Sequence, residues 1–299
     1  MELPLSRASV PRLEFVTTTG STNDDLRAAA TGPEAAEWPH GSVIVTDDQT
    51  HGRGRLGRTW LAPTGKTLAI SVLLRPEGPG GTPLPLEAYG WIPLIAGAAM
   101  TEAVRGEVER AALQLRGDED DGTGGIRVEL KWPNDVLVAG YKVCGILSEL
   151  LPPTAPAGAP SGSGMDASAA PGAGVVVGAG LNLTLDEHDL PTLTSTSLLL
   201  ATGVRPDADA VLAAYLTRLL ALVGTLAEHG GDAASSGIAE RVAALCGTLG
   251  SAVHVRLPAD QELVGTAERL DGDGRLVVRD RNGEAQTVSA GDITHLRYG

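Results

Sequence analysis

The 299-residue chain carries 37 acidic and 23 basic residues, a formal net charge of −14. This balance excludes a broad basic face, and with it a general binder of nucleic acid or anionic membranes. The two cysteines form no CxxC pair, which excludes a disulfide framework and a cysteine zinc site and favours a reducing, cytoplasmic compartment. Residues 1–10 show no secretory pattern, and the apolar window 84–104 is interrupted by charge, glycine and proline, so we expect a soluble protein without a membrane span.

Apolar periodicity predicts the elements of the first 247 residues. Helical periods occupy 23–30, 90–105 and 207–228. Ser21 or Thr22 is the expected N-cap of the first helix. Strand-like runs cover 42–49, 67–75, 126–138 with a break at Pro133 and Asn134, 141–151, and 175–185. Because several strands follow one another before the next helix, the pattern predicts an α+β fold with a mixed sheet.

The pattern changes after Gly247. Short alternating runs are separated by the turn signals DGDG and NG, which are typical of hairpins. The sequence therefore predicts a larger domain over 1–247 and a small barrel-like β domain over 248–299.

Two segments resemble insertions. Residues 116–125 are acidic and glycine-rich, and residues 152–174 are almost entirely Pro, Ala, Gly and Ser. Neither can bury much apolar surface, so we expect mobile loops. The acidic run 118–121 is interpreted as part of a solvated loop rather than as a metal site, because nothing orders its carboxylates in advance.

The loop GRGRLGRTW, residues 52–60, is the first segment whose residues indicate a binding site. Glycines let backbone N–H groups approach an anion, and arginines add forked donors suited to carboxylate or phosphate. The alternative is an RGG-like RNA segment or a flexible basic loop. A single copy in an acidic globular chain favours binding of an anionic ligand.

The motif KWPNDVLV, residues 131–138, places a lysine at the end of a β run, directly before Trp-Pro. Lys131 in such a place can face a buried anion, or it can point to water from a strand edge. Lys142 follows a tight AGY turn a few residues later, and two lysines on neighbouring strands can flank one phosphorylated ligand.

Two further motifs are less specific. GSTND, residues 20–24, is a helix cap that also offers hydroxyls and N–H groups to a ligand. VVVGAGLNL, residues 175–183, is a strand whose glycines permit close approach, but no GxGxxG opens a helix. The chain has no P-loop, GxSxG or HExxH motif, and its histidines show no ligand spacing. His51 is interpreted as a loop residue and Cys144 as a core residue.

In this order, GSTND, QTHGRGRLGRTW, KWPNDVLV, KVCGILSE and VVGAGLNL resemble the biotin protein ligases, over residues 13 to the end. The resemblance implies a mixed sheet related to class II aminoacyl-tRNA synthetases and lipoate ligases, followed by an SH3-like barrel. Because the first motif begins near residue 20, we expect a ligase without an N-terminal DNA-binding domain. His51 stands where the family more often has a small residue, and both insertions are longer than the family's core requires.

The resemblance implies an ATP-dependent ligase that forms biotinyl-5′-AMP and transfers biotin to a lysine of a carboxyl carrier domain of a carboxylase. Lys131 and Arg55 are the expected catalytic residues. The expected biotin contacts are Ser21, Thr22, Asn23, Gln49, Gly52, Arg53, Gly54, Arg55, Lys131, Gly145 and Ile146. The expected ATP contacts are Arg53, Arg55, Arg58, Trp60, Lys131, Asn134, Lys142 and Asn182. The use of ATP implies Mg²⁺, for which the sequence names no protein ligand.

Three other functions remain open at this point. A lipoate ligase would share the chemistry but not the GRGRxGR and KWPND pair; a biotin-responsive regulator would need a DNA-binding domain; a bare nucleotide-binding module would not need Lys131 and Arg55. We expect no nucleic-acid or membrane partner and a monomer or weak homodimer. Lys131 is not expected to become covalently adenylated, because nucleotidyl-lysine enzymes use a KxDG context that KWPND lacks.

Overall fold

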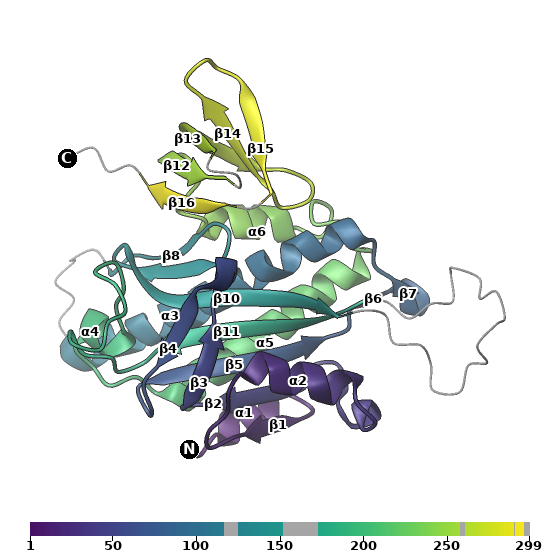
Figure 1. Ribbon diagram of the computed structural model, residues 1–299, viewed down its shortest axis with the longest axis vertical. Helices are drawn as coiled ribbons and strands as arrows, with labels where there is room; N and C mark the ends of the chain where they lie inside the picture. Colours follow the sequence, from purple (N-terminus) through teal and green to yellow (C-terminus); the bar gives the residue numbers. More distant parts are fainter. Residues whose placement is uncertain (117–124, 152–172, 258–260, 290, 296–299) are drawn as a thin grey trace.

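A seven-stranded sheet carries most of the chain in the computed structural model, which describes residues 1–116, 125–151, 173–257, 261–289 and 291–295 (Figure 1). The strand order is β1-β2-β5-β11-β10-β9-β8. Only β1 and β2 pair in parallel within this sheet, so the predicted α+β fold with a mixed sheet is confirmed. The strands are Leu13–Phe15 (β1), Val43–Thr46 (β2), Thr67–Leu74 (β5), Val128–Lys131 (β8), Asp135–Val138 (β9), Tyr141–Leu151 (β10) and Gly174–Asn182 (β11).

The two faces of the sheet are distinguished by strand alternation. In β5, Leu68, Ile70 and Val72 join the main core, whereas Leu73 joins a smaller cluster on the opposite face. The long helices α3 (Ile92–Arg116) and α5 (Ala208–Glu228) cover the main-core face, and α2 (Thr22–Thr31) lies on the other (Figure 1). Much of that second face is left to polar and small residues, and the site described below lies there.

The predicted helices are present with altered bounds. The period 90–105 belongs to α3, which begins at Ile92 after a 3₁₀ segment, Leu86–Trp91, and continues to Arg116. The shorter helices α1, α4 and α6 were not predicted; they span Pro4–Ser9, Leu198–Thr202 and Ile238–Leu245. Among the described helices, α5 is long and apolar enough to cross a membrane, but half of its apolar window is buried, largely against α3. Its composition is therefore accounted for by the core.

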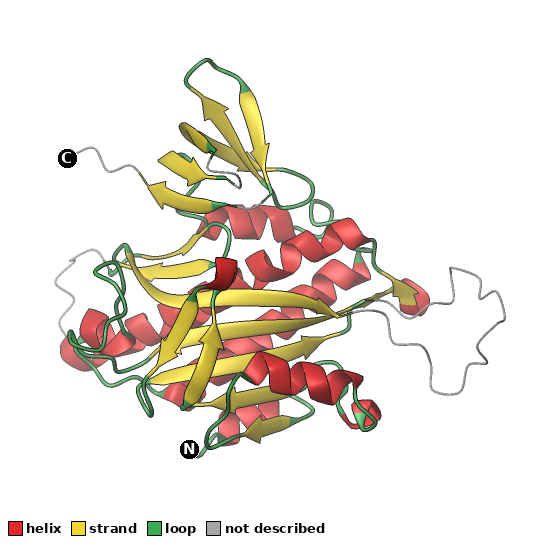
Figure 2. Cartoon of the chain, viewed as in Figure 1, coloured by secondary structure: helices red, strands yellow, loops and turns green. Residues whose placement is uncertain are grey.

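The C-terminal residues form a separate five-stranded antiparallel sheet, ordered β15-β14-β13-β12-β16 (Figure 2). Its strands are Ala252–Arg256 (β12), Glu262–Leu270 (β13), Leu276–Asp280 (β14), Ala285–Val288 (β15) and Asp292–His295 (β16). Turns at the predicted DGDG and NG signals place Gly274 and Gly283 at positive φ. The DGDG turn packs on the larger domain, since Trp91 and Trp132 donate their indole N–H groups to Gly272 O (2.8 Å) and Gly274 O (3.0 Å).

One strand prediction was wrong in its extent. The run 42–49 ends as β2 at Thr46, because Asp48 N donates to Thr46 Oγ1 (3.0 Å) in a local turn. The chain then forms a hairpin outside the main sheet from β3 (Gln49–Arg53) and β4 (Thr59–Ala62), while Glu77–Gly78 (β6) and Thr82–Pro83 (β7) make a second small ribbon. The predicted mobile insertions 116–125 and 152–174, with the acidic run 118–121, lie almost entirely outside the described residues.

Candidate active site

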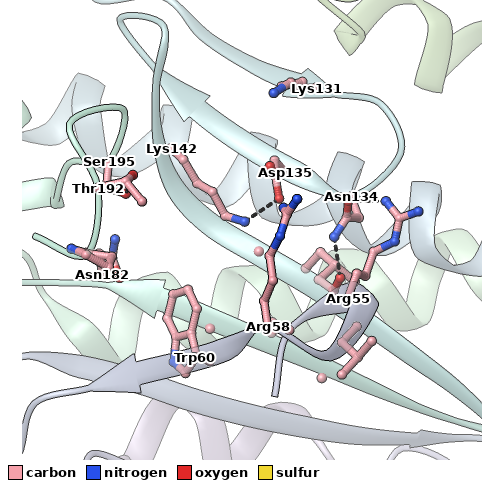
Figure 3. Close-up of a pocket in the computed structure, with 18 of the residues that line it drawn as sticks. Arg55, Arg58, Trp60, Lys131, Asn134, Asp135, Lys142, Asn182, Thr192 and Ser195 are labelled. Carbon is pink, nitrogen blue, oxygen red and sulfur yellow. Dashed lines mark hydrogen bonds and ion pairs between the residues drawn. The ribbon is translucent and has the colours of Figure 1, made fainter. Parts of the chain in front are cut away.

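A cavity of about 680 Å³ opens on the face of the sheet that carries α2. Its walls come from the start of α2, the hairpin β3–β4, the strands β8 to β11, the segment 191–195 and the strand β16. Segments far apart in sequence therefore converge on one volume, and Figure 3 shows part of the side chains that line it. This volume is large enough for a ligand of drug size.

A chain of neutral hydrogen bonds forms one end of the cavity. Ser21 is the N-cap of α2, and its side chain accepts from Asp24 N at 3.4 Å, as the sequence predicted for Ser21 or Thr22. Gln49 Oε1 accepts from Thr22 N (2.9 Å) and lies 3.2 Å from Thr22 Oγ1, which in turn lies 2.8 Å from Ser71 Oγ. Ser21, Thr22 and Gln49 line the cavity, so this end presents amide and hydroxyl groups without a charge.

Asn23 extends the same network toward β10 and β11. Its Oδ1 accepts from Ser71 Oγ (2.6 Å), and its Nδ2 donates to Glu149 Oε2 (2.7 Å). The amide lies so close to β11 that a Cβ at Gly178 would be 2.5 Å from Asn23 Oδ1. The first glycine of the GxG motif therefore makes room for a protein side chain that forms the floor.

The second glycine of that motif makes room for Trp60. A Cβ at Gly180 would lie 2.4 Å from the indole ring, and Trp60 lines the cavity from β4. Among the described residues, the Trp60 Nε1 donor is buried without a hydrogen-bond partner. A buried donor left in this state is suited to an acceptor on a bound ligand.

The hairpin β3–β4 carries the glycine–arginine loop across the cavity. Arg53 pairs with Thr59 where the strands end, and Gly54 N donates to Arg58 O at 2.7 Å, which closes residues 54–58 into a compact turn. Gly57 has φ +72°, a conformation that favours glycine. Arg55 Nη1 donates to Asn134 Oδ1 at 2.9 Å, and Figure 3 shows Arg58 extending toward the strand that carries Asp135.

The motif KWPND forms the turn between β8 and β9. Lys131 is the last residue of β8 and pairs with Asp135, the first residue of β9. The Trp132–Pro133 peptide bond between them is cis. Asn134 is held against β10, because its Nδ2 donates to Ile146 O (2.7 Å) and its carbonyl accepts from Ile146 N (2.8 Å). Lys131 and Asn134 therefore enter the cavity from a braced turn rather than from a free edge.

Lys142 and Asn182 define the opposite end of the cavity. Ala139 and Gly140 both have positive φ, which explains the tight turn predicted before Lys142. Lys142 Nζ forms an ion pair with Asp135 Oδ1 at 2.6 Å, and Asn182 Nδ2 donates to Thr196 O at 2.8 Å (Figure 3). The segment 192–196 is thereby tied to the cavity wall.

Arg53 is held by two carboxylates. Its guanidinium forms two bonds of 2.8 Å to Asp24 and lies 3.2 Å from Glu149 Oε1. The hydrogen bond to Asp24 is the main cause that raises the pKa of Arg53 above its ordinary value. Arg27 also contacts both carboxylates, at 3.0 and 2.7 Å, so four charged groups form one cluster.

The structure brings nearly all of the sequence-predicted site residues into one cavity. Those that line it are Ser21, Thr22, Asn23, Gln49, Arg53, Gly54, Arg55, Arg58, Trp60, Lys131, Asn134, Lys142, Gly145, Ile146 and Asn182. Gly52 is buried within the hairpin, where a Cβ would lie 2.5 Å from Gln49 Nε2, so it packs against a site residue instead of lining the cavity.

Several lining residues were not predicted. Asp135 stands in the quoted KWPND motif, and pairing with Lys131 across the hairpin is the signal that would have found it. Further ones lie on the strands of the sheet and the hairpin, such as Thr59, Ala69, Glu129 and Gly178. Eight more come from two segments that carry no local motif: Pro191, Thr192, Thr194 and Ser195, and Gly291, Ile293, Thr294 and His295. The second group reaches the cavity only through pairing of β16 with β12.

Residues that the sequence analysis set aside lie outside the cavity wall. His51 is exposed on the hairpin. Cys144 is fully buried, and desolvation raises the pKa of its thiol to about 12, so the interpretation of Cys144 as a core residue is supported. Among the described residues, no group of three or more His, Cys, Asp or Glu side chains is arranged to hold a metal ion.

The sequence of the chain is similar to those of known ligases. A family model described as the Biotin/lipoate A/B protein ligase family matches residues 17–164, and one described as the Biotin protein ligase C terminal domain matches residues 248–296. The chain is 34% identical to a biotin--[acetyl-CoA-carboxylase] ligase of Mycobacterium tuberculosis over 287 residues, 96% of this chain and 90% of that protein.

Solved structures show the same fold. The biotin protein ligase of Aquifex aeolicus in complex with biotin and ATP is 24% identical, with a TM-score of 0.62 over 96% of this chain and all of that chain. The ligase of Leishmania major in complex with biotin is also 24% identical, with a TM-score of 0.55 over 94% of this chain and 99% of that one.

Proposed function

The chain belongs to the biotin protein ligase family, and from this premise we propose that it activates biotin with ATP and transfers it to a lysine of a carboxylase's carboxyl carrier domain. In the first step the biotin carboxylate attacks the α-phosphorus of ATP, which forms biotinyl-5′-AMP and releases pyrophosphate. In the second step the carrier lysine's amine attacks the acyl carbon, forms the amide and releases AMP.

The observation that carries this proposal is the division of the cavity into a neutral end and a cationic middle. Ser21, Thr22 and Gln49 offer hydrogen bonds to an uncharged polar group such as biotin's ureido ring. Arg55, Arg58 and Lys131 supply positive charge farther along the same cavity. Both reactants of the first step are anions, so fixed cationic groups between them lower the cost of bringing them together.

We assign roles on this basis. Lys131 lies between carboxylate and α-phosphate as the central electrophilic group, and Arg55 contacts both and keeps the adenylate in place. Arg58 reaches the polyphosphate, while Lys142, Asn134 and Asn182 contact the nucleotide. Gly145 and Ile146 line the biotin pocket, and Trp60 walls the site beside Gly180. The predicted contact of Arg53 with the substrates stays a prediction, because Asp24 and Glu149 already bind its guanidinium.

Magnesium would accompany the nucleotide. Mg²⁺ in such sites is held mainly by phosphate oxygens and water, with one or two carboxylates. Asp135 and Glu129 are the cavity carboxylates that fit this requirement, although Lys142 and Arg127 already pair with them. The ion would neutralise polyphosphate charge as pyrophosphate leaves.

The finer architecture and cellular setting belong to the same proposal. We place the domain boundary at 247/248, which is supported by the second family match from residue 248. We interpret the C-terminal sheet as an SH3-like barrel and the larger domain as related to class II aminoacyl-tRNA synthetases. The protein is proposed to work in the cytoplasm as a monomer or weak homodimer, without nucleic-acid or membrane partners.

The test is transfer to a carrier domain, measured by mass spectrometry of the acceptor. Incubation with ATP, Mg²⁺ and biotin should modify one lysine, and lipoate should neither be transferred nor compete. Transfer of lipoate in place of biotin would favour the lipoate-ligase alternative. Biotin binding without transfer, combined with binding to DNA, would favour a regulator instead.

A further inference from the structure

The hairpin β3–β4 needs anchors, because a two-stranded ribbon is only marginally stable by itself. Its base is fixed where Thr50 N and His51 N donate to Thr19 O (2.9 Å) and Gly20 O (2.8 Å). Neither β3 nor β4 forms strand pairs with the seven-stranded sheet. The loop that carries Arg55 and Arg58 therefore depends on side chains to hold it over the cavity.

Arg53 is placed to act as that anchor. It is the last residue of β3 and pairs with Thr59, so it sits where the loop 54–58 begins and ends. Its guanidinium meets Asp24 through two parallel bonds, the geometry that makes arginine–carboxylate pairs specific. A fixed Arg53 sets the direction in which the compact turn projects.

Glu149 connects this anchor to the floor of the cavity. One of its oxygens, Oε2, accepts from Asn23 Nδ2 (2.7 Å), while Oε1 lies 2.7 Å from Arg27 and 3.2 Å from Arg53. Asn23 in turn packs on Gly178 of β11. The same carboxylate thus holds a loop residue and a floor residue, which couples the loop's position to the biotin end of the site.

We propose that Asp24 and Glu149 are positioning residues that anchor Arg53 and thereby hold the glycine–arginine loop over the cavity. This inference rests on the proposed function for its catalytic consequence, but the anchoring itself rests only on the contacts of Arg53 with Asp24 and Glu149. It assigns Arg53 to the scaffold of the loop and leaves the reacting anions to Arg55, Arg58 and Lys131.

Limited trypsin digestion of the ligand-free protein tests the anchor directly, with cleavage after Arg55 and Arg58 followed by mass spectrometry. When opening is fast, the cleavage rate follows the population of the open loop. Loss of a half-exposed ion pair should raise that rate about two- to fivefold in Asp24→Asn and Glu149→Gln. Asp24→Glu, which keeps the carboxylate, should retain most of the protection.

Asp25→Asn is the matched control. Asp25 lies in the same first turn of α2 and accepts from Thr19 Oγ1 instead of pairing with Arg53. An asparagine at this position can still accept that hydrogen bond, so the substitution removes the same charge while Thr19 O continues to hold the base of the hairpin. Equal cleavage rates in Asp24→Asn, Glu149→Gln and Asp25→Asn would overturn the proposal. Arg53→Lys provides a second test if Asp24→Asn or Glu149→Gln does not fold. The lysine keeps the positive charge but cannot form two parallel bonds to the Asp24 carboxylate, so this variant should also be cleaved faster than wild type.

The effect of the anchor on catalysis is measured in a separate assay. In biotin-dependent pyrophosphate exchange, Asp24→Asn should raise the KM for biotin more than it lowers kcat, because the catalytic groups are intact but less often in place. Faster cleavage with unchanged KM would refute the catalytic coupling. Absence of exchange in the wild-type protein would refute the proposed function and leave the digestion result standing.

Discussion

The guanidinium of Arg55 donates from Nη1 to Oδ1 of Asn134 across 2.9 Å, and this contact joins the glycine–arginine loop to the turn of the KWPND motif. The orientation of the Asn134 amide is fixed independently, since its Nδ2 donates to Ile146 O at 2.7 Å. The oxygen must then face Arg55. The two motifs that are separated by about a quarter of the chain thus form one structural unit at the centre of the cavity.

Removal of Arg55 should release the adenylate. Arg55→Gly deletes a cationic group from the cavity and unlinks the loop from Asn134, so biotinyl-AMP should escape and label lysines of bystander proteins. Detection of biotin on an unrelated protein in the same mixture measures this. Arg281→Gly, on an exposed turn of the C-terminal sheet, is the control. Labelling by Arg55→Gly no greater than by this control would show that Arg55 does not retain the intermediate.

The second glycine of the GxG motif should not tolerate a side chain. In Gly180→Ala the new Cβ would lie 2.4 Å from the Trp60 ring, and the resulting overpacking should cost about 1–3 kcal/mol of unfolding free energy. The displaced indole should also raise the KM for ATP. Gly106→Ala on α3 is the control, because its Cβ meets nothing within 4 Å and should stabilise the helix by about 0.5–1 kcal/mol. Equal stability of both variants would contradict the close packing of Trp60 on β11.

Both cysteines should be inert in the folded protein. Burial raises the pKa of the Cys144 thiol to about 12, and it also raises the pKa of the Cys246 thiol. Thiolates react and thiols do not, so a chromogenic thiol reagent at pH 8 should titrate neither residue until denaturant is added. Between the unfolded value and about 12 only the unfolded state loses the Cys144 proton, so stability should fall as pH rises through that window. Rapid modification of native protein would contradict this.

Much of this fold follows from local signals in the sequence. The Ser21 cap and the break between β8 and β9 follow from capping and from proline, and the strands β10 and β11 follow from apolar runs. The hairpin β3–β4 was missed because residues 42–49 form one continuous β-prone run, and only a side-chain bond to Thr46 ends the strand. No local pattern shows where it stops.

The residues of the site were also predictable only where the signal is local. Those within the motifs were predicted because each motif is a short continuous segment, and most of them meet in the cavity. The pairing of Arg53 with Asp24 and Glu149 joins positions 29 and 96 residues apart, and no spacing in the sequence indicates it. Likewise, His295 reaches the cavity only because β16 pairs with β12. Contacts that depend on strand order require the folded structure.

Stability should depend on pH through Glu102. Arg241 donates two bonds of 2.8 Å to this carboxylate, and that interaction is the main cause that lowers the pKa of Glu102. The unfolded chain therefore takes up the proton at a higher pH than the native protein, so the contribution is present above the unfolded pKa and lost as pH falls through the folded one. Glu102→Gln should lower the melting temperature at pH 7, and the difference from wild type should be smaller at an acid pH below the unfolded pKa, where the native carboxylate also begins to take up its proton. An equal loss at both pH values would refute the ionic origin.

The most direct test of the account is exchange of labelled pyrophosphate into ATP, measured for the wild-type protein and for Lys131→Ala. Exchange should require biotin, should not occur with lipoate, and should fall by about two orders of magnitude or more in Lys131→Ala, as for removal of one central electrostatic group. Exchange that persists in folded Lys131→Ala, or that is absent from folded wild-type protein with biotin, would contradict the assignment of this cavity as the site of biotin activation.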